Sequence, residues 1–168
     1  MKGVRDNIGK LAYATLFVAI IPPLLVAWAI ATADIIPLPV PPFRFVGFIL
    51  VAVGVFLMLA GTWALWFHGG GLPMSPYPPP VYVSKGVYRL IPHPMYVGFT
   101  VLCFGIAMIT ESPSGFWLVS SCVALGCAAL VLGFERYEIR RRFGEDAVQR
   151  TLISLPVDST DPPTGWDR

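Results

Sequence analysis

Two long stretches without a charged residue constrain this chain more than any other feature. They cover residues 11–33 and 45–67, and each is as long as the roughly 20 mainly apolar residues that a helix needs to cross a bilayer. Two further apolar segments, 94–110 and 115–134, follow as a pair around a short polar turn. We therefore predict an all-α integral membrane protein with about four transmembrane helices at these four positions.

Composition agrees with this class. Hydrophobic residues make up 55% of the 168 residues and charged residues 13%, whereas a soluble domain usually carries about 25% charged residues. The first stretch follows three basic residues but is too long for the apolar region of a signal peptide, which covers about 7–15 residues. We expect it to be retained, within a single membrane domain at residues 1–155. The segment 94–110 is short, so we expect it to pack against the neighbouring helices.

Positive charge predicts the orientation, because cytoplasmic loops carry the excess of Lys and Arg. Basic residues lie before the first apolar stretch, between the second and third, and after the fourth: Lys2, Arg5, Lys10, Lys85, Arg89, Arg136, Arg140, Arg141 and Arg142. The loops between the first and second apolar stretches and between the third and fourth contain only one basic residue, Arg44. We predict a multi-pass protein of a bacterial inner or plasma membrane, with both termini and the loop 68–93 in the cytoplasm. The net charge of +2 indicates no nucleic-acid partner.

The cysteines and histidines do not indicate a metal site. Cys103, Cys122 and Cys127 lie in apolar segments without ligand spacing, so we expect them to be small buried hydrophobic residues. His68 and His93 are the only histidines, and neither belongs to a ligand-spaced cluster. We predict no bound metal.

The loop 68–93 has the most unusual composition in the chain. It is rich in Gly and Pro, with three consecutive residues of each type, and this composition predicts no regular helix. A long loop of this kind is typically functional or disordered. Beyond the last apolar segment, residues 135–150 predict an amphipathic helix at the membrane surface, and residues 156–168 predict a disordered tail.

Three features meet on the predicted cytoplasmic face. They are this loop, the segment 86–98 and Glu135. Glu135 is an ionisable residue at the edge of an apolar helix, and a charge at such a position requires an explanation. His93 and the tyrosines 82, 88 and 96 lie in the first two features. Together they indicate a polar and aromatic binding site at that face.

The same residues carry a resemblance. VYVSKGVYRLIPHPMYVG at 81–98, an apolar hairpin, and then E-x-x-x-I-x-x-x-F-G at 135–144 resemble the signature of the isoprenylcysteine carboxyl methyltransferase and phospholipid methyltransferase superfamily of integral membrane enzymes. The resemblance covers about residues 80–144. Pro92, Val131 and Arg136 depart from the pattern, so the sequence leaves the methyl acceptor open.

The resemblance implies methyl transfer from S-adenosyl-L-methionine, with S-adenosyl-L-homocysteine as product, to a lipophilic or membrane-accessible acceptor. A prenylcysteine-like carboxylate, a lipid amine and a small thiol all stay open, with membrane lipid as a partner and the oligomeric state open. The implied catalytic residues are His93 and Glu135. The implied cofactor-binding positions are Pro80, Val81, Tyr82, Val83, Tyr88, His93, Pro94, Met95, Tyr96 and Glu135.

Two other readings stay open. A reductase of the steroid or sterol type, which uses NADPH, has a similar C-terminal region, but its motif tends to read H-P-N-Y-x-G-E, and this chain has Met95 and Phe99 at the differing positions. A membrane scaffold without enzymatic activity is the third possibility. Its support is Pro92, which replaces the Arg that usually precedes His-Pro.

Overall fold

Helices make up all the regular structure in the part of the chain that can be described. The computed structural model describes residues 15–69, 83, 85–135 and 141. Its elements follow in the order η1 (Leu16–Ile20), α2 (Ile21–Ala31), α3 (Arg44–Ala64), η2 (Leu65–Gly69), η3 (Gly86–Arg89), α4 (Pro94–Ile109), η4 (Ser114–Ser120), α5 (Ser121–Leu130) and η5 (Val131–Glu135). The all-α prediction is therefore confirmed for these residues.

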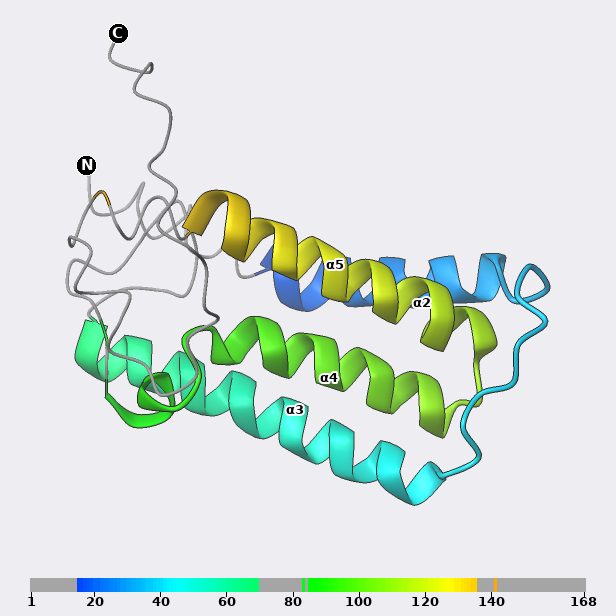
Figure 1. Cartoon of the computed structure of the whole chain (residues 1–168), viewed down its shortest axis with the longest axis horizontal. Helices are drawn as coiled ribbons and strands as arrows, with labels where there is room; N and C mark the ends of the chain where they lie inside the picture. The colour runs from blue at the N-terminus through cyan, green and yellow to red at the C-terminus, as the bar shows by residue number, and fades with distance from the viewer. Residues whose placement is uncertain (1–14, 70–82, 84, 136–140, 142–168) are drawn as a thin grey trace, which may run out of the picture.

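Four apolar helical segments form an elongated bundle (Figure 1). Two of them, Arg44–His68 and Ser114–Gly133, are 25 and 20 residues long and are apolar enough to cross a membrane. The other two, Ile21–Ala31 and Pro94–Ile109, are apolar but shorter. Large apolar side chains on α3 face outward, with Phe45 76% exposed. Such a surface favours a lipid environment over water.

The helices α3 and α4 pack closely because glycines face each other along their contact. Gly47 and Gly54 on α3 and Gly98 and Gly105 on α4 are buried, and each pair is spaced by seven residues. A Cβ on Gly54 would lie 2.7 Å from the carbonyl oxygen of Gly98, and a Cβ on Gly105 would lie 2.9 Å from that of Gly47. Only a hydrogen at these positions lets the two backbones approach this closely.

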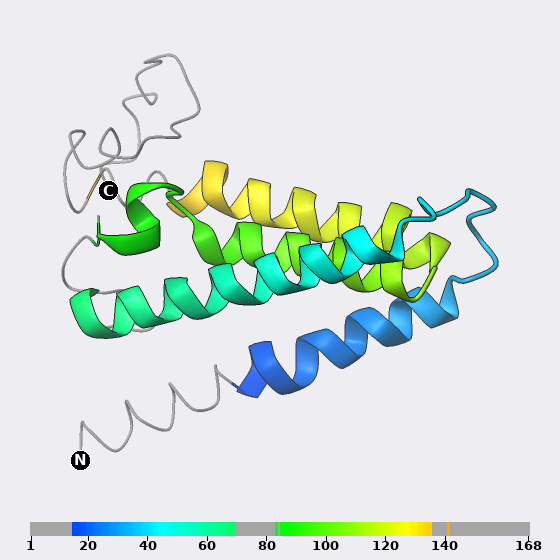
Figure 2. The ribbon, with the colours of Figure 1, turned by 90° about the horizontal axis from the view of Figure 1, so that it is seen from below.

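The helix α2 is attached mainly near its C-terminal end, where it comes closest to the rest of the bundle (Figure 2). The hydroxyl of Ser114 donates a hydrogen bond to the carbonyl oxygen of Thr32. Trp117 Nε1 donates to the carbonyl oxygen of Pro39 at 3.1 Å. These bonds attach the 32–43 connection to η4, while α2 itself contains no buried residue.

Pro22 and Pro23 lie in the first turn of α2, directly after the π-helical segment η1. Proline has no amide N–H, so the carbonyls one turn earlier lose their α-helical donors. Those carbonyls belong to η1, and this is where the helix departs from α geometry.

Two expectations need correction. Cys122 is exposed, whereas Cys103 and Cys127 are partly buried, so the prediction of burial is wrong for Cys122. The reason is that α5 has no buried residue and turns part of its surface away from the bundle. The loop 68–93 also contains some helix: η2 includes His68 and Gly69, and η3 adds one 3-10 turn. Gly86 begins that turn with a φ of +64°, a conformation that favours glycine.

Candidate functional site

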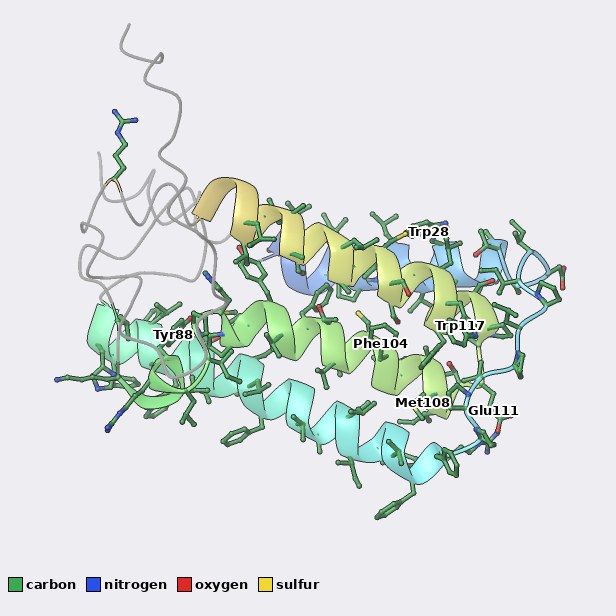
Figure 3. All side chains as sticks on the ribbon, viewed as in Figure 1. Trp28, Tyr88, Phe104, Met108, Glu111 and Trp117 are labelled. Atoms are coloured by element: carbon green, nitrogen blue, oxygen red, sulfur yellow. The ribbon has the colours of Figure 1, made fainter. Side chains whose placement is uncertain are left out.

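The described part of the predicted site gathers at one end of the bundle, here named the site end. This end contains η2, η3, the start of α4 and the end of η5 (Figure 1). Tyr88 lies there, whereas Met108, Glu111 and Trp117 lie at the opposite end (Figure 3). The bundle thus brings segments together that are up to about 70 positions apart in the sequence, from η2 to η5.

Not all predicted site residues can be placed. Val83, Tyr88, His93, Pro94, Met95 and Tyr96 are described with their side chains, and Glu135 is described as the last residue of η5. Pro80, Val81 and Tyr82 lie outside the described residues, as do most of the predicted surface helix at 135–150 and the whole tail at 156–168.

A small cluster of apolar residues lies at the site end. Val83 is 6% exposed and packs with Ala64 and Leu65, which belong to the junction of α3 and η2. Tyr88 and Met95 are partly buried against this cluster. We call these five residues the floor cluster. Because it joins α3, η2, η3 and α4, it determines where the segment before α4 lies relative to α3.

The start of α4 is held against α3 by a second set of contacts. Pro94 is fully buried and begins the helix, a position where its missing N–H and restricted φ are favourable. Gly61 of α3 leaves room for it, because a Cβ there would lie 2.8 Å from Cγ of Met95 and 3.3 Å from Cγ of Pro94. The Thr62 hydroxyl donates to the carbonyl oxygen of Met58 at 2.8 Å and approaches Met95 Sδ at 3.9 Å.

His93 and Tyr96 present rings next to each other at this point. His93 is the residue that precedes the first turn of α4, with φ −130° and ψ 63°. Its ring centroid lies 6.0 Å from that of Tyr96, with an angle of 35° between the planes. Both residues are partly buried. An imidazole and a phenol ring thus lie near each other at the start of α4, where Pro94 and Met95 pack against α3.

The other histidine, His68, has its described contact within its own helix. His68 Nδ1 lies 3.3 Å from the carbonyl oxygen of Ala64, one turn earlier in the same helix. Within the described part of the chain, no group of three or more His, Cys, Asp or Glu side chains could hold a metal ion. Lys85, which precedes η3, and Arg89, its last residue, are both exposed, so this segment has a cationic side chain at each end.

Sequence reasoning missed the residues of α3 and η2 that support the site. Gly61, Thr62, Ala64 and Leu65 contact the predicted site residues, yet each is an ordinary member of an apolar segment. The seven-residue spacing of the glycines 47, 54 and 61 is the one signal that could have indicated which face of this helix meets α4.

Comparison with known proteins agrees with the motif. A family model described as phospholipid methyltransferase matches residues 43–146, which is more than half of the chain and includes α3 as well as the segment that carries the motif. No curated protein and no solved structure gave a match. The extent of the family match, from the start of α3 beyond the end of η5, shows that this chain belongs to the phospholipid methyltransferase family of membrane methyltransferases.

Proposed function

We propose that this protein transfers the methyl group of S-adenosyl-L-methionine to a lipophilic or membrane-accessible acceptor, at the site end of the bundle. The observation that carries the proposal is the floor cluster. It joins the motif segment to α3 and places Tyr88, Met95 and the His93–Tyr96 ring pair at one end of the helices. Family membership supports methyl transfer as the reaction.

The residue types fit such a cofactor. Adenine stacks on apolar and aromatic surfaces, which Tyr88, Tyr96 and Met95 offer. The cofactor is a cation at sulfur, and an aromatic face stabilises a desolvated cation by up to about 2 kcal/mol. Val83 and Pro94 are buried. We therefore assign them a role in shaping the site and no side-chain contact with the cofactor. Pro80, Val81 and Tyr82 complete the proposed cofactor-binding set.

His93 and Glu135 are the proposed catalytic residues. When bound, the cofactor would supply a methyl group activated by its positively charged sulfur, and the other product would be S-adenosyl-L-homocysteine. The protein's part is chiefly to hold the acceptor in line with the bond between that methyl group and the sulfur, because orientation accounts for several kcal/mol of the barrier in such reactions. We assign Glu135 to the amino-acid end of the cofactor and His93 to the reacting centre.

The proposed topology has both termini and the site end on the cytoplasmic side, where the soluble cofactor is available. The basic residues Lys85 and Arg89 at the site end support it, since cytoplasmic loops are enriched in positive charge. The acceptor would then approach from the bilayer.

Calorimetry on the detergent-purified full-length protein tests the proposal. We expect S-adenosylhomocysteine to bind, NADPH not to bind, and Glu135→Gln to weaken binding by more than about 1 kcal/mol, as expected for the loss of a charge-assisted hydrogen bond. His93→Ala should lower the rate of methyl transfer without unfolding the protein. Binding of NADPH instead, or of neither compound, would overturn the proposed function.

A further inference from the structure

The two ends of the bundle differ in whether their cations have a partner of opposite charge. At the end that contains Glu111 (Figure 3), Arg44 forms a salt bridge with that carboxylate. At the site end, Lys85 and Arg89 are exposed, and neither forms a salt bridge with a described residue. The acidic side chains that the structure describes, those of Asp34 and Glu111, both belong to the opposite end. The described part of the site end therefore has an uncompensated positive charge.

The backbone that carries these two cations is fixed against α3. Val83 is buried in the floor cluster, and Tyr88 is partly buried against it. Between these two residues, a Cβ on Gly86 would lie 3.9 Å from Cβ of Ala64. The turn η3 accordingly lies beside the end of α3 (Figure 2). Packing against α3 thus sets the backbone position of both cations, one before the turn and one at its end.

Exposed apolar side chains accompany this charge. Leu90 follows Arg89 directly, and Trp66 and Phe67 follow Leu65 of the floor cluster. Leu90, Trp66 and Phe67 are each more than half exposed. A ligand that matches such a surface has an anionic group next to an apolar part. A phospholipid has both, whereas a soluble anion such as inorganic phosphate has only the first.

We propose that the surface formed by Lys85, Arg89, Leu90, Trp66 and Phe67, here named the η3 surface, binds an anionic phospholipid of the surrounding bilayer. Lysine and arginine attract anionic lipid headgroups, and both donate charge-assisted hydrogen bonds to phosphate oxygens. Phosphatidylglycerol is the test lipid, because its phosphate charge is not offset by a choline cation as in phosphatidylcholine. It has no amine, thiol or carboxylate, so this binding is separate from the proposed reaction.

Melting temperatures of the full-length protein in a neutral detergent test whether the lipid binds. A ligand of the folded state raises its stability, so phosphatidylglycerol should raise the melting temperature by at least about 2 °C more than the same amount of phosphatidylcholine. The double variant Lys85→Gln/Arg89→Gln should lose this difference. Arg44→Gln removes an exposed cation from the opposite end and should keep it. Equal shifts with the two lipids in the wild type, or an unchanged difference in the double variant, would overturn the proposal.

Quenching of tryptophan fluorescence by brominated lipids tests where the lipid binds. Of the five tryptophans, one variant keeps Trp66 and another keeps Trp117, which lies at the opposite end (Figure 3), and the others are replaced by Phe. In mixed vesicles, brominated phosphatidylglycerol should bind next to Trp66 at least about threefold more strongly than brominated phosphatidylcholine. The ratio should be about one at Trp117, and about one at Trp66 after Lys85→Gln/Arg89→Gln. A ratio of one at Trp66 in the parent variant, or the same preference at Trp117, would overturn the η3 surface as the binding site.

Discussion

Arg44 and Glu111 form an ion pair with 2.7 Å between Nε and Oε1, across 67 positions of sequence. Arg44 is the first residue of α3, and Glu111 follows the end of α4 in a turn where its φ is +51°. The pair therefore joins the ends of the two helices that pack most closely. Because both side chains are exposed, its contribution to stability is small.

This pair predicts a specific response to acid. The Arg44 guanidinium, through its hydrogen bond and its charge, lowers the pKa of Glu111 below the ordinary value of 4.5. The stabilising contribution is therefore present above about pH 4.5 and is lost as the pH falls through the lowered pKa. Glu111→Gln should melt slightly below the wild type at pH 7, with a smaller difference at high salt, and should lack this part of the acid response.

The matched control is Asp34→Asn, which removes an exposed carboxylate from the same end of the bundle. The ion pair stays intact in this variant, so the salt dependence of its melting temperature should match that of the wild type. The interpretation of the ion pair would be wrong if Glu111→Gln and the wild type lost the same stability between neutral pH and a pH below the lowered pKa of Glu111.

The glycine contact between α3 and α4 predicts that replacing one of these glycines by alanine, which adds a single methyl group, lowers the stability of the protein. Gly54→Ala would place Cβ 2.7 Å from the Gly98 carbonyl oxygen, and Gly98→Ala would place it 2.8 Å from that of Gly54. Since backbone cannot move aside as a flexible side chain can, we expect each variant to lose about 1–3 kcal/mol. Unfolding in a graded mixture of mild and denaturing detergents measures this difference.

Gly126→Ala on α5 provides the control, because nothing lies within 4 Å of a Cβ at that position. Its stability should be unchanged or higher by up to about 1 kcal/mol, owing to the better helix propensity of alanine. Equal losses for Gly54→Ala and Gly126→Ala would show that backbone approach is not the cause.

The attachment of α2 predicts a localised effect. Ser114 is fully buried, and its hydroxyl donates to the Thr32 carbonyl oxygen. Ser114→Ala should lower the free energy of unfolding by about 1 kcal/mol and increase proteolytic cleavage in the connection between α2 and α3. Ser121→Ala is the control, because the Ser121 side chain makes no hydrogen bond within the described part of the chain. Cleavage that does not change in Ser114→Ala would contradict this attachment.

The floor cluster links stability to the proposed function. Val83→Ala removes two buried methyl groups and should lower the free energy of unfolding by about 1–2 kcal/mol. Because Val83 positions the segment that leads to His93, we also expect weaker binding of S-adenosylhomocysteine, measured by calorimetry. Val46→Ala, at an exposed position of α3, should change neither quantity. A less stable Val83→Ala protein with unchanged binding would show that the floor does not position the cofactor site.

The helical class and the family motif follow from the amino-acid sequence without any tertiary contact. Run length and the near absence of charge are local properties, so they predict apolar helices wherever the chain places them. The order of residues from Val81 to Gly98 and from Glu135 to Gly144 likewise indicated the methyltransferase resemblance without any knowledge of packing. The roles of all the predicted site residues stay predictions. For Pro80, Val81, Tyr82 and Glu135, the side chains also lie outside the described part of the chain.

Which faces of these helices meet is known only from their packing in three dimensions. Hydropathy is nearly uniform around an apolar helix, so it does not distinguish Gly54, which contacts α4, from Phe56, which points outward. Nor does it indicate that Thr62 and Ala64 support Met95 and Val83. Contacts between residues distant in sequence depend on shape and register, because dispersion forces act only at contact distance. That register also places Pro94 and Met95 against Gly61.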